Sequence, residues 1–372
     1  MAQYIHEIPG WTDMKYDESA VQNALVQFYN IQGKLFGKLD AFGFDVQNDL
    51  LLNSLSDEVV TSFEIEGEKL DKTSVRSSVA KKLGLDTAGI VGVKHDHYTE
   101  DIIEMTVDAT QRYSDPVTDE RIFGWHCAIF PTGRSGIRNI AIGSYRLNEM
   151  SVVSGAIGRE TIHYKAPSPD RVPDEMTKFI HWLENDNKND PYIKSAIAHL
   201  WFESIHPFDD GNGRIGRAIS DLLLARAEES SKRFYSLSSQ ILAERNDYYN
   251  ELEHAQKSTG SPERWITWFL GCLTRAVYAS DIKLEKIKHK AVFFENIRTA
   301  SLNQRQIIML NKIIDGFEGK ITTSKWAKIN KCSHDTALRD IEDLIIKKIM
   351  HRLPEGGRST SYDLNENLLK ST

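Results

Sequence analysis

Apolar residues recur at helical spacing along most of this chain, and the pattern predicts a mainly α-helical fold. One such stretch begins at Ser19, and another follows Pro173 with apolar residues at positions i, i+3, i+4 and i+7. Residues 191–204 repeat the pattern and begin with a proline, which suits the first turn of a helix. A serine-capped helix is expected over residues 236–257, and a long helix begins at Pro262.

Two stretches lack this pattern and are expected to be irregular, and a third is expected to end a helix. Residues 1–20 are expected to form an extended arm anchored by Trp11 and Tyr16. The sequence His95-Asp96-His97 has no third metal ligand at a diagnostic spacing, so we prefer a loop to a metal site. The charged run at residues 283–290 is expected to be a solvated helix end that leads to a linker.

One β-hairpin is indicated in the middle of the chain. Residues 151–164 mix β-branched residues with Gly155 and Gly158, a pattern typical of two short strands and a turn. From the local pattern alone, a plain surface hairpin is nearly as good an interpretation as a functional one.

The C-terminal region has a different order of elements. It predicts a helix ended by Gly316, a short helix around Trp326, a third helix opening at Ser333, and a hairpin with its turn at residues 355–357. This order resembles a winged helix-turn-helix, with residues 333–347 at the position of the recognition helix.

The charge of this region leaves its partner open. Lys and Arg outnumber Asp and Glu by twelve to nine in residues 301–372, although the whole chain has a formal net charge of -7. A basic module suits DNA, but acidic residues in the third helix weaken that interpretation. Protein contact or homodimer formation is an equal alternative. The acidic residues are Asp335, Asp340, Glu342 and Asp343.

Length and composition limit the class of protein. A chain of 372 residues exceeds the usual single core, and we expect a helical N-terminal domain at 1–100, a central core at 101–290 and the C-terminal domain at 295–372. Three widely spaced cysteines form no disulfide or zinc pattern. The N-terminus does not resemble a secretion signal, and no apolar run is long enough to span a bilayer. We therefore expect a cytoplasmic protein without membrane contact.

Residues 206–217 hold the densest cluster of chemically useful side chains. His206 precedes a proline, so it should lie at the end of a helix, where it can act as a base. Gly211 and Gly213 let the backbone approach a ligand at the start of the next helix, whose amides form an anion site. Two arginines on that helix can bind phosphate oxygens, and a carboxylate before it can hold Mg²⁺. These are Arg214, Arg217 and Asp210.

The string His-Pro-Phe-Asp-Asp-Gly-Asn-Gly-Arg-Ile-Gly-Arg resembles, at every fixed position, the signature of the Fic family. The resemblance implies a Fic-type helical core that transfers AMP from ATP to a Ser, Thr or Tyr hydroxyl of a target protein and releases pyrophosphate. By this resemblance His206 is the general base and Asp210 the magnesium ligand. The stretch Gly211, Asn212 and Gly213 forms the anion hole, and Arg214 and Arg217 bind the β and γ phosphates.

A second motif lies far upstream. Ser62 and Glu66 are four residues apart, and so share one face of a helix that Gly67 can end. This resembles the inhibitory motif of some Fic proteins, which implies that Glu66 pairs with Arg217 and prevents productive ATP binding. The alternative is a solvated acidic helix end, because Glu64, Glu66 and Glu68 alternate.

The resemblance also assigns roles to the hairpin and to a later helix. It implies that the hairpin is a flap that covers the nucleotide and docks the target hydroxyl by strand pairing. The flap residues are Thr161, Ile162, His163 and Tyr164. By family position, three further residues are expected to approach the adenosine: Tyr248, Tyr249 and Gln256.

Other functions are compatible with the same residues. A Fic core can use another donor and move UMP, phosphocholine or a phosphoryl group, or it can remove AMP with Glu66 positioning water. A different class is a transcription regulator whose core senses nucleotide while its tail binds DNA.

Overall fold

The computed structural model describes residues 3–85, 97–155, 159, 161–257, 261–354 and 360–369, with the side chains of His97 and Tyr98 left out. It is mainly helical, as the spacing of apolar residues predicts. Packing divides it into a larger unit, Met1–Ser280, and a smaller unit, Asp281–Thr372. The expected domains at 1–100, 101–290 and 295–372 stay a prediction. Packing separates only residues 1–280 from residues 281–372.

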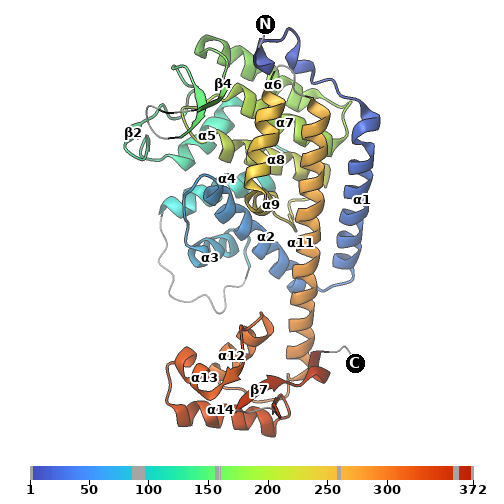
Figure 1. Ribbon diagram of the computed structural model, residues 1–372, viewed down its shortest axis with the longest axis vertical. Helices are drawn as coiled ribbons and strands as arrows, with labels where there is room; N and C mark the ends of the chain where they lie inside the picture. Colours follow the sequence, from blue (N-terminus) through green and yellow to red (C-terminus); the bar gives the residue numbers. More distant parts are fainter. Residues whose placement is uncertain are drawn as a thin grey trace. The chain divides into compact units, whose positions relative to one another are not determined.

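Two adjacent helices form the centre of the larger unit, α7 (Pro191–Ile205) and α8 (Asn212–Ala227) (Figure 1). Nearly every side chain of α7 is buried, so its polar residues Ser195, His199 and Glu203 lie within the core. Pro191 opens α7 and the Asp190 carboxylate caps it. The surrounding helices pack against this pair: α4 (His97–Gln111), α5 (Asp119–Ile129), α6 (Val172–Asn185) and α10 (Arg245–Gln256).

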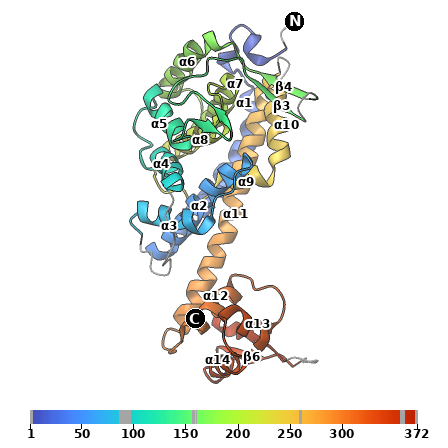
Figure 2. The same ribbon diagram turned by 90° about the vertical axis from the view of Figure 1, so that its left-hand side faces the viewer.

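The N-terminal segment contributes α1 (Glu18–Asp40), α2 (Phe44–Ile65) and α3 (Lys72–Lys82). In two views α2 lies against α9 (Leu237–Ala243) (Figures 1 and 2). The helix α2 also contacts α8.

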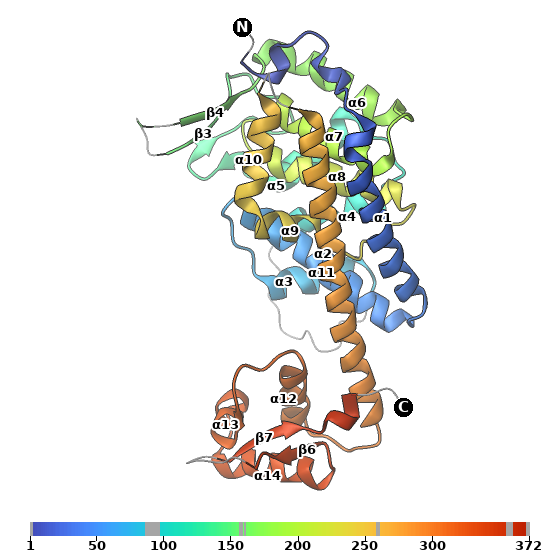
Figure 3. The same cartoon turned by 45° about the vertical axis from the view of Figure 1, so that its right-hand side comes forward.

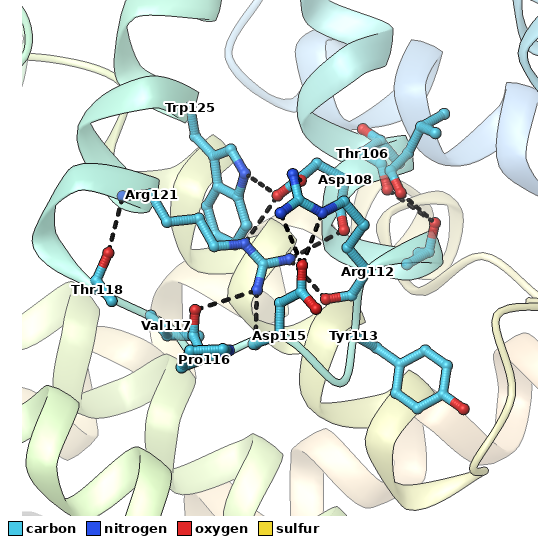
Figure 4. Close-up of polar contacts among 12 residues, drawn as sticks. Thr106, Asp108, Arg112, Tyr113, Asp115, Pro116, Val117, Thr118, Arg121 and Trp125 are labelled. Atoms are coloured by element: carbon cyan, nitrogen blue, oxygen red, sulfur yellow. Dashed lines mark hydrogen bonds and ion pairs between the residues drawn. The ribbon is translucent and has the colours of Figure 1, made fainter.

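A polar hub holds α4 against α5 (Figure 4). The Asp108 carboxylate accepts hydrogen bonds from Arg121 Nε and Trp125 Nε1, both at 2.8 Å. Arg121 also donates to the backbone carbonyls of Arg112 and Asp115. Because one guanidinium satisfies several carbonyls at the end of α4, the hub fixes the turn that leads into α5.

Two small hairpins separate α5 from α6. The first pairs β1 (Arg134–Ser135) with β2 (Arg138–Asn139). The second pairs β3 (Ser151–Ser154) with β4 (Thr161–Lys165), in the register Val152 to Tyr164, and lies beside α10 (Figure 3). This confirms the predicted hairpin, although residues 156–158 and 160 lie outside the described residues. A short 3₁₀ helix, Pro169–Arg171, leads into α6.

Four local expectations were wrong. Residues 1–20 are not a fully extended arm, because two 3₁₀ helices form at Ile5–Glu7 and Trp11–Asp13. Trp11 is an anchor as expected, since it is buried and packs on Trp201. The predicted helix over 236–257 is broken at Glu244, whose ψ of 30° separates α9 from α10. His97 begins α4 instead of lying in a loop, whereas His95 and Asp96 lie outside the described residues.

The fourth concerns the expected linker. Residues 283–290 continue a single helix, α11 (Pro262–Asn296), because Leu284 and Phe293 bury one face of the charged run. The boundary between the two units therefore falls within a helix.

The smaller unit has its own core around Trp326, Ile341 and Leu344. After the end of α11 its elements are α12 (Gln304–Ile314), β5 (Ile321–Thr322), α13 (Thr323–Asn330), α14 (His334–Ile346), β6 (Met350–Arg352), β7 (Ser361–Leu364) and a 3₁₀ helix, Glu366–Leu369. Its sheet has the antiparallel order β5-β7-β6. The helices match the expected order, but the winged-helix assignment stays a prediction and the turn at 355–357 lies outside the described residues.

Candidate active site

His206 ends α7 in a left-handed conformation with a φ of 50°. Pro207 follows and cannot continue the helix, so the chain turns there. The imidazole Nδ1 lies 3.3 Å from the carbonyl oxygen of Glu203. A carbonyl only accepts, so Nδ1 carries the proton and Nε2 keeps its lone pair. Burial lowers the pKa of His206 to about 4, so the ring is neutral near pH 7 and able to accept a proton.

The turn after His206 is held by side chains at its base. Asn212 donates to the carbonyl of Phe208 and accepts from its amide, both at 2.9 Å. Arg146 donates to the carbonyl of His206 at 2.8 Å, and His126 Nε2 lies 3.1 Å from the carbonyl of Asp210. The Asn212 side chain therefore fixes the loop. Its expected role in binding nucleotide stays a prediction.

The anion loop requires glycine at position 211, and glycine at position 213 leaves room for the Glu66 carboxylate. Gly211 has a φ of +85°, and a Cβ there would lie 2.8 Å from the ring of Phe130. A Cβ at Gly213 would lie 2.5 Å from Glu66 Oε1 and 3.1 Å from Arg217 Nη1. The first amides of α8 have no acceptor within the helix, so a carboxylate at this position meets a favourable helix terminus.

The upstream motif reaches Arg217. Arg217 Nη2 lies 3.0 Å from Glu66 Oε1, and the guanidinium also donates to Ser62 Oγ at 2.9 Å and to the Ser62 carbonyl at 2.7 Å. Gly67 takes a φ of +84° just after the end of α2. Arg217 is buried, yet the Glu66 side chain is 31% exposed, so the acid enters from the surface.

Arg214 has an acidic partner that the sequence reasoning did not single out. Glu68 Oε1 accepts from Arg214 Nη1 at 2.6 Å, and Asp210 Oδ1 lies 3.2 Å from Nη2. The guanidinium lies over the rings of Phe63 and Phe130. Both arginines of the motif are therefore covered by acids from the segment after α2. The alternation of Glu64, Glu66 and Glu68 was the available signal, since it places Glu66 and Glu68 close together.

Asp210 is suited to a metal that arrives with a phosphate ligand. Its Oδ2 accepts from the Ser135 hydroxyl, its Oδ1 accepts from the Gly211 amide at 2.5 Å, and its side chain is 41% exposed. Among the described residues no group of three or more His, Cys, Asp or Glu could hold a metal ion. Mg²⁺ binds through one or two carboxylates plus substrate phosphates, so a single exposed carboxylate beside the anion loop fits it.

The flap residues differ in where they point. Tyr164 is buried, and its hydroxyl donates to the Ser204 carbonyl at 2.7 Å and lies 3.0 Å from His6 Nδ1. His163 Nδ1 lies 2.8 Å from Glu253 Oε2 on α10. In contrast, Thr161 and Ile162 are exposed. The flap is thus anchored by its C-terminal half and open along its N-terminal half.

Most of the residues expected near adenosine form hydrogen bonds within the protein. The Tyr248 hydroxyl lies 2.9 Å from His199 Nε2 in a fully buried network. Gln256 is buried and donates to the Glu203 carbonyl at 3.1 Å. Tyr249 alone is partly open, at 38% exposed. Their predicted contact with adenosine stays a prediction.

Glu203 is a further residue that the sequence did not indicate. It is buried in α7, one turn before His206, and its Oε2 lies 3.7 Å from His206 Nδ1. Burial raises the pKa of Glu203 to about 8.

Parts of the chain are similar to known protein families and to known transferases. Residues 116–224 match the Fic/DOC family, and residues 4–85 match a domain of unknown function, DUF4172. A probable protein adenylyltransferase of Aquifex aeolicus is 29% identical over 183 residues, which are 49% of this chain and 52% of that protein. A uridine 5'-monophosphate transferase of Xanthomonas campestris is 32% identical over 119 residues, which are 30% of this chain and 21% of that protein. The chain thus matches about half or less of the length of these relatives.

The fold agrees with these matches. The crystal structure of a Fic family protein from Desulfovibrio desulfuricans aligns with a TM-score of 0.56 at 20% identity, over 95% of this chain and 98% of that one. No described helix of this chain is long and apolar enough to cross a membrane. Because the complete signature loop, the helix before it and most of the helix after it lie within residues 116–224, this part of the chain is a Fic/DOC domain.

Proposed function

We propose that this protein transfers AMP from ATP to a hydroxyl side chain of a target protein, and that Glu66 restrains the reaction. The observation that carries this proposal is the position of the Glu66 carboxylate, which lies against Gly213 and 3.0 Å from Arg217 Nη2. A site that attracts a carboxylate with a helix N-terminus and a buried guanidinium also suits a phosphate group.

The chemistry follows from the neutral imidazole. His206 Nε2 takes the proton of the target hydroxyl while the hydroxyl oxygen attacks the α-phosphorus of ATP. The bond from the α-phosphorus to the bridging oxygen breaks, and pyrophosphate leaves toward Arg214 and Arg217. A Mg²⁺ ion on Asp210 would neutralise charge on the phosphates. Most of the rate comes from positioning and from fixed charges, because the protein forms no covalent bond itself.

The target is proposed to dock along the flap. The β3–β4 sheet has two strands, so each strand has one edge without a strand partner among the described residues. Val153 and Ile162 are 50% and 58% exposed on this hairpin. A target segment that pairs with the hairpin through its backbone can present different side chains to His206.

The test is labelling of a cell lysate with ATP that carries a labelled α-phosphate. Glu66→Gly should increase labelling about tenfold or more over the wild-type protein, since it frees Arg217. His206→Ala in the same background should reduce it about 100-fold or more. Equal labelling by the Glu66→Gly protein and the double variant would reject His206 as the base.

A second candidate differs only in the donor. The similarity to a uridine 5'-monophosphate transferase favours testing UTP beside ATP. A donor panel with α-labelled ATP, UTP, GTP and CTP, using the Glu66→Gly protein, distinguishes the two. Preferred labelling from UTP would replace AMP by UMP in the proposal and leave the assigned residues unchanged.

A further inference from the structure

Glu203 lies between the base and the phosphate-binding arginine. Its Oε2 is 3.7 Å from His206 Nδ1, and its own carbonyl is 3.3 Å from the same nitrogen. Its Oε1 has no hydrogen-bond partner among the described residues, although the atom is fully buried. A Cβ at Gly216 would lie 2.7 Å from this oxygen, so the carboxyl packs against α8 one residue before Arg217. The Glu203 Oε2 and the Glu203 carbonyl oxygen both lie near His206 Nδ1. His206 Nε2 is therefore left for the substrate.

The charges around these two groups come from several elements. Glu66 after α2 and Asp210 in the loop raise the pKa of His206, whereas Arg146 before the flap lowers it. Those that act on Glu203 are Arg217 on α8 and Glu66, and Tyr248 on α10 also faces it. Burial is the main cause of the raised pKa of Glu203; Arg217 opposes that rise and Glu66 adds to it.

We propose that Glu203 is a positioning residue for His206, and that Glu66 withholds its negative charge while it occupies the anion loop. This rests on the proposed function of His206 as the base. With Glu66 in place, Arg217 is neutralised and a second carboxylate beside it is disfavoured. When Glu66 leaves, Arg217 stabilises the Glu203 carboxylate, which accepts from Nδ1–H and stabilises the imidazolium formed when Nε2 takes the hydroxyl proton.

Glu66 therefore acts twice. It blocks the phosphate site, and it keeps the carboxyl group beside His206 neutral, although its own charge raises the pKa of His206. ATP does not have the same effect, because its phosphate tail is also neutralised by Mg²⁺ and Arg214. The effect on His206 is separate from ATP binding, so it can be measured in the nucleotide-free protein.

The test is the titration of the His206 imidazole, followed by NMR in full-length protein with ¹³C-labelled histidine. The signal is assigned by its loss in His206→Ala. In the Glu66→Gly background, Glu203→Gln should lower the titration midpoint by about one pH unit, because it removes the facing carboxylate and keeps its shape. Glu203→Asp keeps the charge but moves it away, and should lower the midpoint less. With Glu66 present, Glu203→Gln should change the midpoint less than in the Glu66→Gly background.

The matched control is Glu175→Gln, which removes a buried carboxyl on α6 that does not face His206. It should leave the His206 midpoint unchanged. A midpoint that also stays unchanged, or rises, in Glu203→Gln overturns the proposal. If Glu203→Gln does not fold, a midpoint in Glu203→Asp equal to that of Glu66→Gly overturns it.

Activity provides the second readout. In the Glu66→Gly background, Glu203→Gln should lower kcat about tenfold and leave the KM for ATP nearly unchanged, because it weakens the base and not the phosphate site. If no variant transfers a nucleotide, the proposed function fails, whereas the NMR titration still tests the contact between Glu203 and His206.

Discussion

The middle of α2 and its C-terminal end are joined to the neighbouring helices in different ways. Near its middle, Glu58 is buried and accepts from Ser236 Oγ at 2.7 Å, from the Ser238 amide at 3.0 Å and from the Ser238 hydroxyl. It also shares a hydrogen bond with Asp221 on α8, which pairs with Arg233 at 3.3 Å. We call this set of residues, with Glu228, the anchor of α2.

At the C-terminal end of α2 lie Glu66 and Glu68, which we call the tip. Their side chains are 31% and 39% exposed, whereas their partners Arg217 and Arg214 are buried. A partly exposed carboxylate stays partly hydrated in its ion pair and can leave it at little cost, whereas a buried charge that loses its partner is left without compensation. We therefore expect the tip to leave the arginines while the anchor keeps α2 in place.

The largest expected effect is loss of the anchor's cation. Arg233 is fully buried and lies between Asp221 and Glu228, at 3.3 and 3.5 Å. Arg233→Ala should lower the free energy of unfolding by about 3–5 kcal/mol, because it removes the cation that lies between buried acidic groups. Urea unfolding followed by circular dichroism measures this. The control, Arg264→Ala, breaks an exposed pair with Glu251 and should change stability little.

The second effect is a pH dependence of the anchor. Burial raises the pKa of Asp221 well above its ordinary value, and Glu58 raises it further. The folded state therefore keeps a proton that the unfolded state releases above about pH 4, so the stabilisation present below pH 4 is lost as pH rises toward the folded pKa. Asp221→Asn should flatten this decline in urea unfolding between pH 5 and 8. A slope as steep as that of the wild-type protein would contradict the assignment.

The turn between α7 and α8 was predictable because its residues are contiguous. His206, Asp210 and the glycines lie within one turn between two helices, and proline and glycine signal that turn directly. The pairing of Glu66 with Arg217 spans 151 residues, and only the family resemblance made it predictable.

Other residues gave no such signal. Glu58 looks like any polar helical residue until Ser236, 178 residues away, is packed against it. Glu203 lies in an apolar helix, where its burial depends on α8. The break at Glu244 has no glycine or proline to mark it in the sequence. The helix before it, α9, packs on α2.

A smaller effect on stability is expected at the tip. Glu66→Gly should lower the free energy of unfolding by about 1 kcal/mol or less, since the Glu66 side chain is 31% exposed and Arg217 keeps both bonds to Ser62. The same variant should give the largest increase in labelling. Urea unfolding and labelling of one preparation test both statements. A loss of stability as large as that of Arg233→Ala would mean that the tip, too, is a structural anchor.

The smallest effect is expected for Glu68→Gln. Arg214 would lose one charged partner, but it keeps Asp210 at 3.2 Å and its contacts with the rings of Phe63 and Phe130. Glu66 would still cover Arg217, so labelling should rise only about two- to threefold, against about tenfold or more for Glu66→Gly. In the Glu66→Gly background the added Glu68→Gln should lower the KM for ATP, because Arg214 no longer has to exchange a carboxylate for a phosphate. An increase from Glu68→Gln alone that equals that of Glu66→Gly would show that the two acids leave together, as one tip, and that Arg214 is restrained as strongly as Arg217.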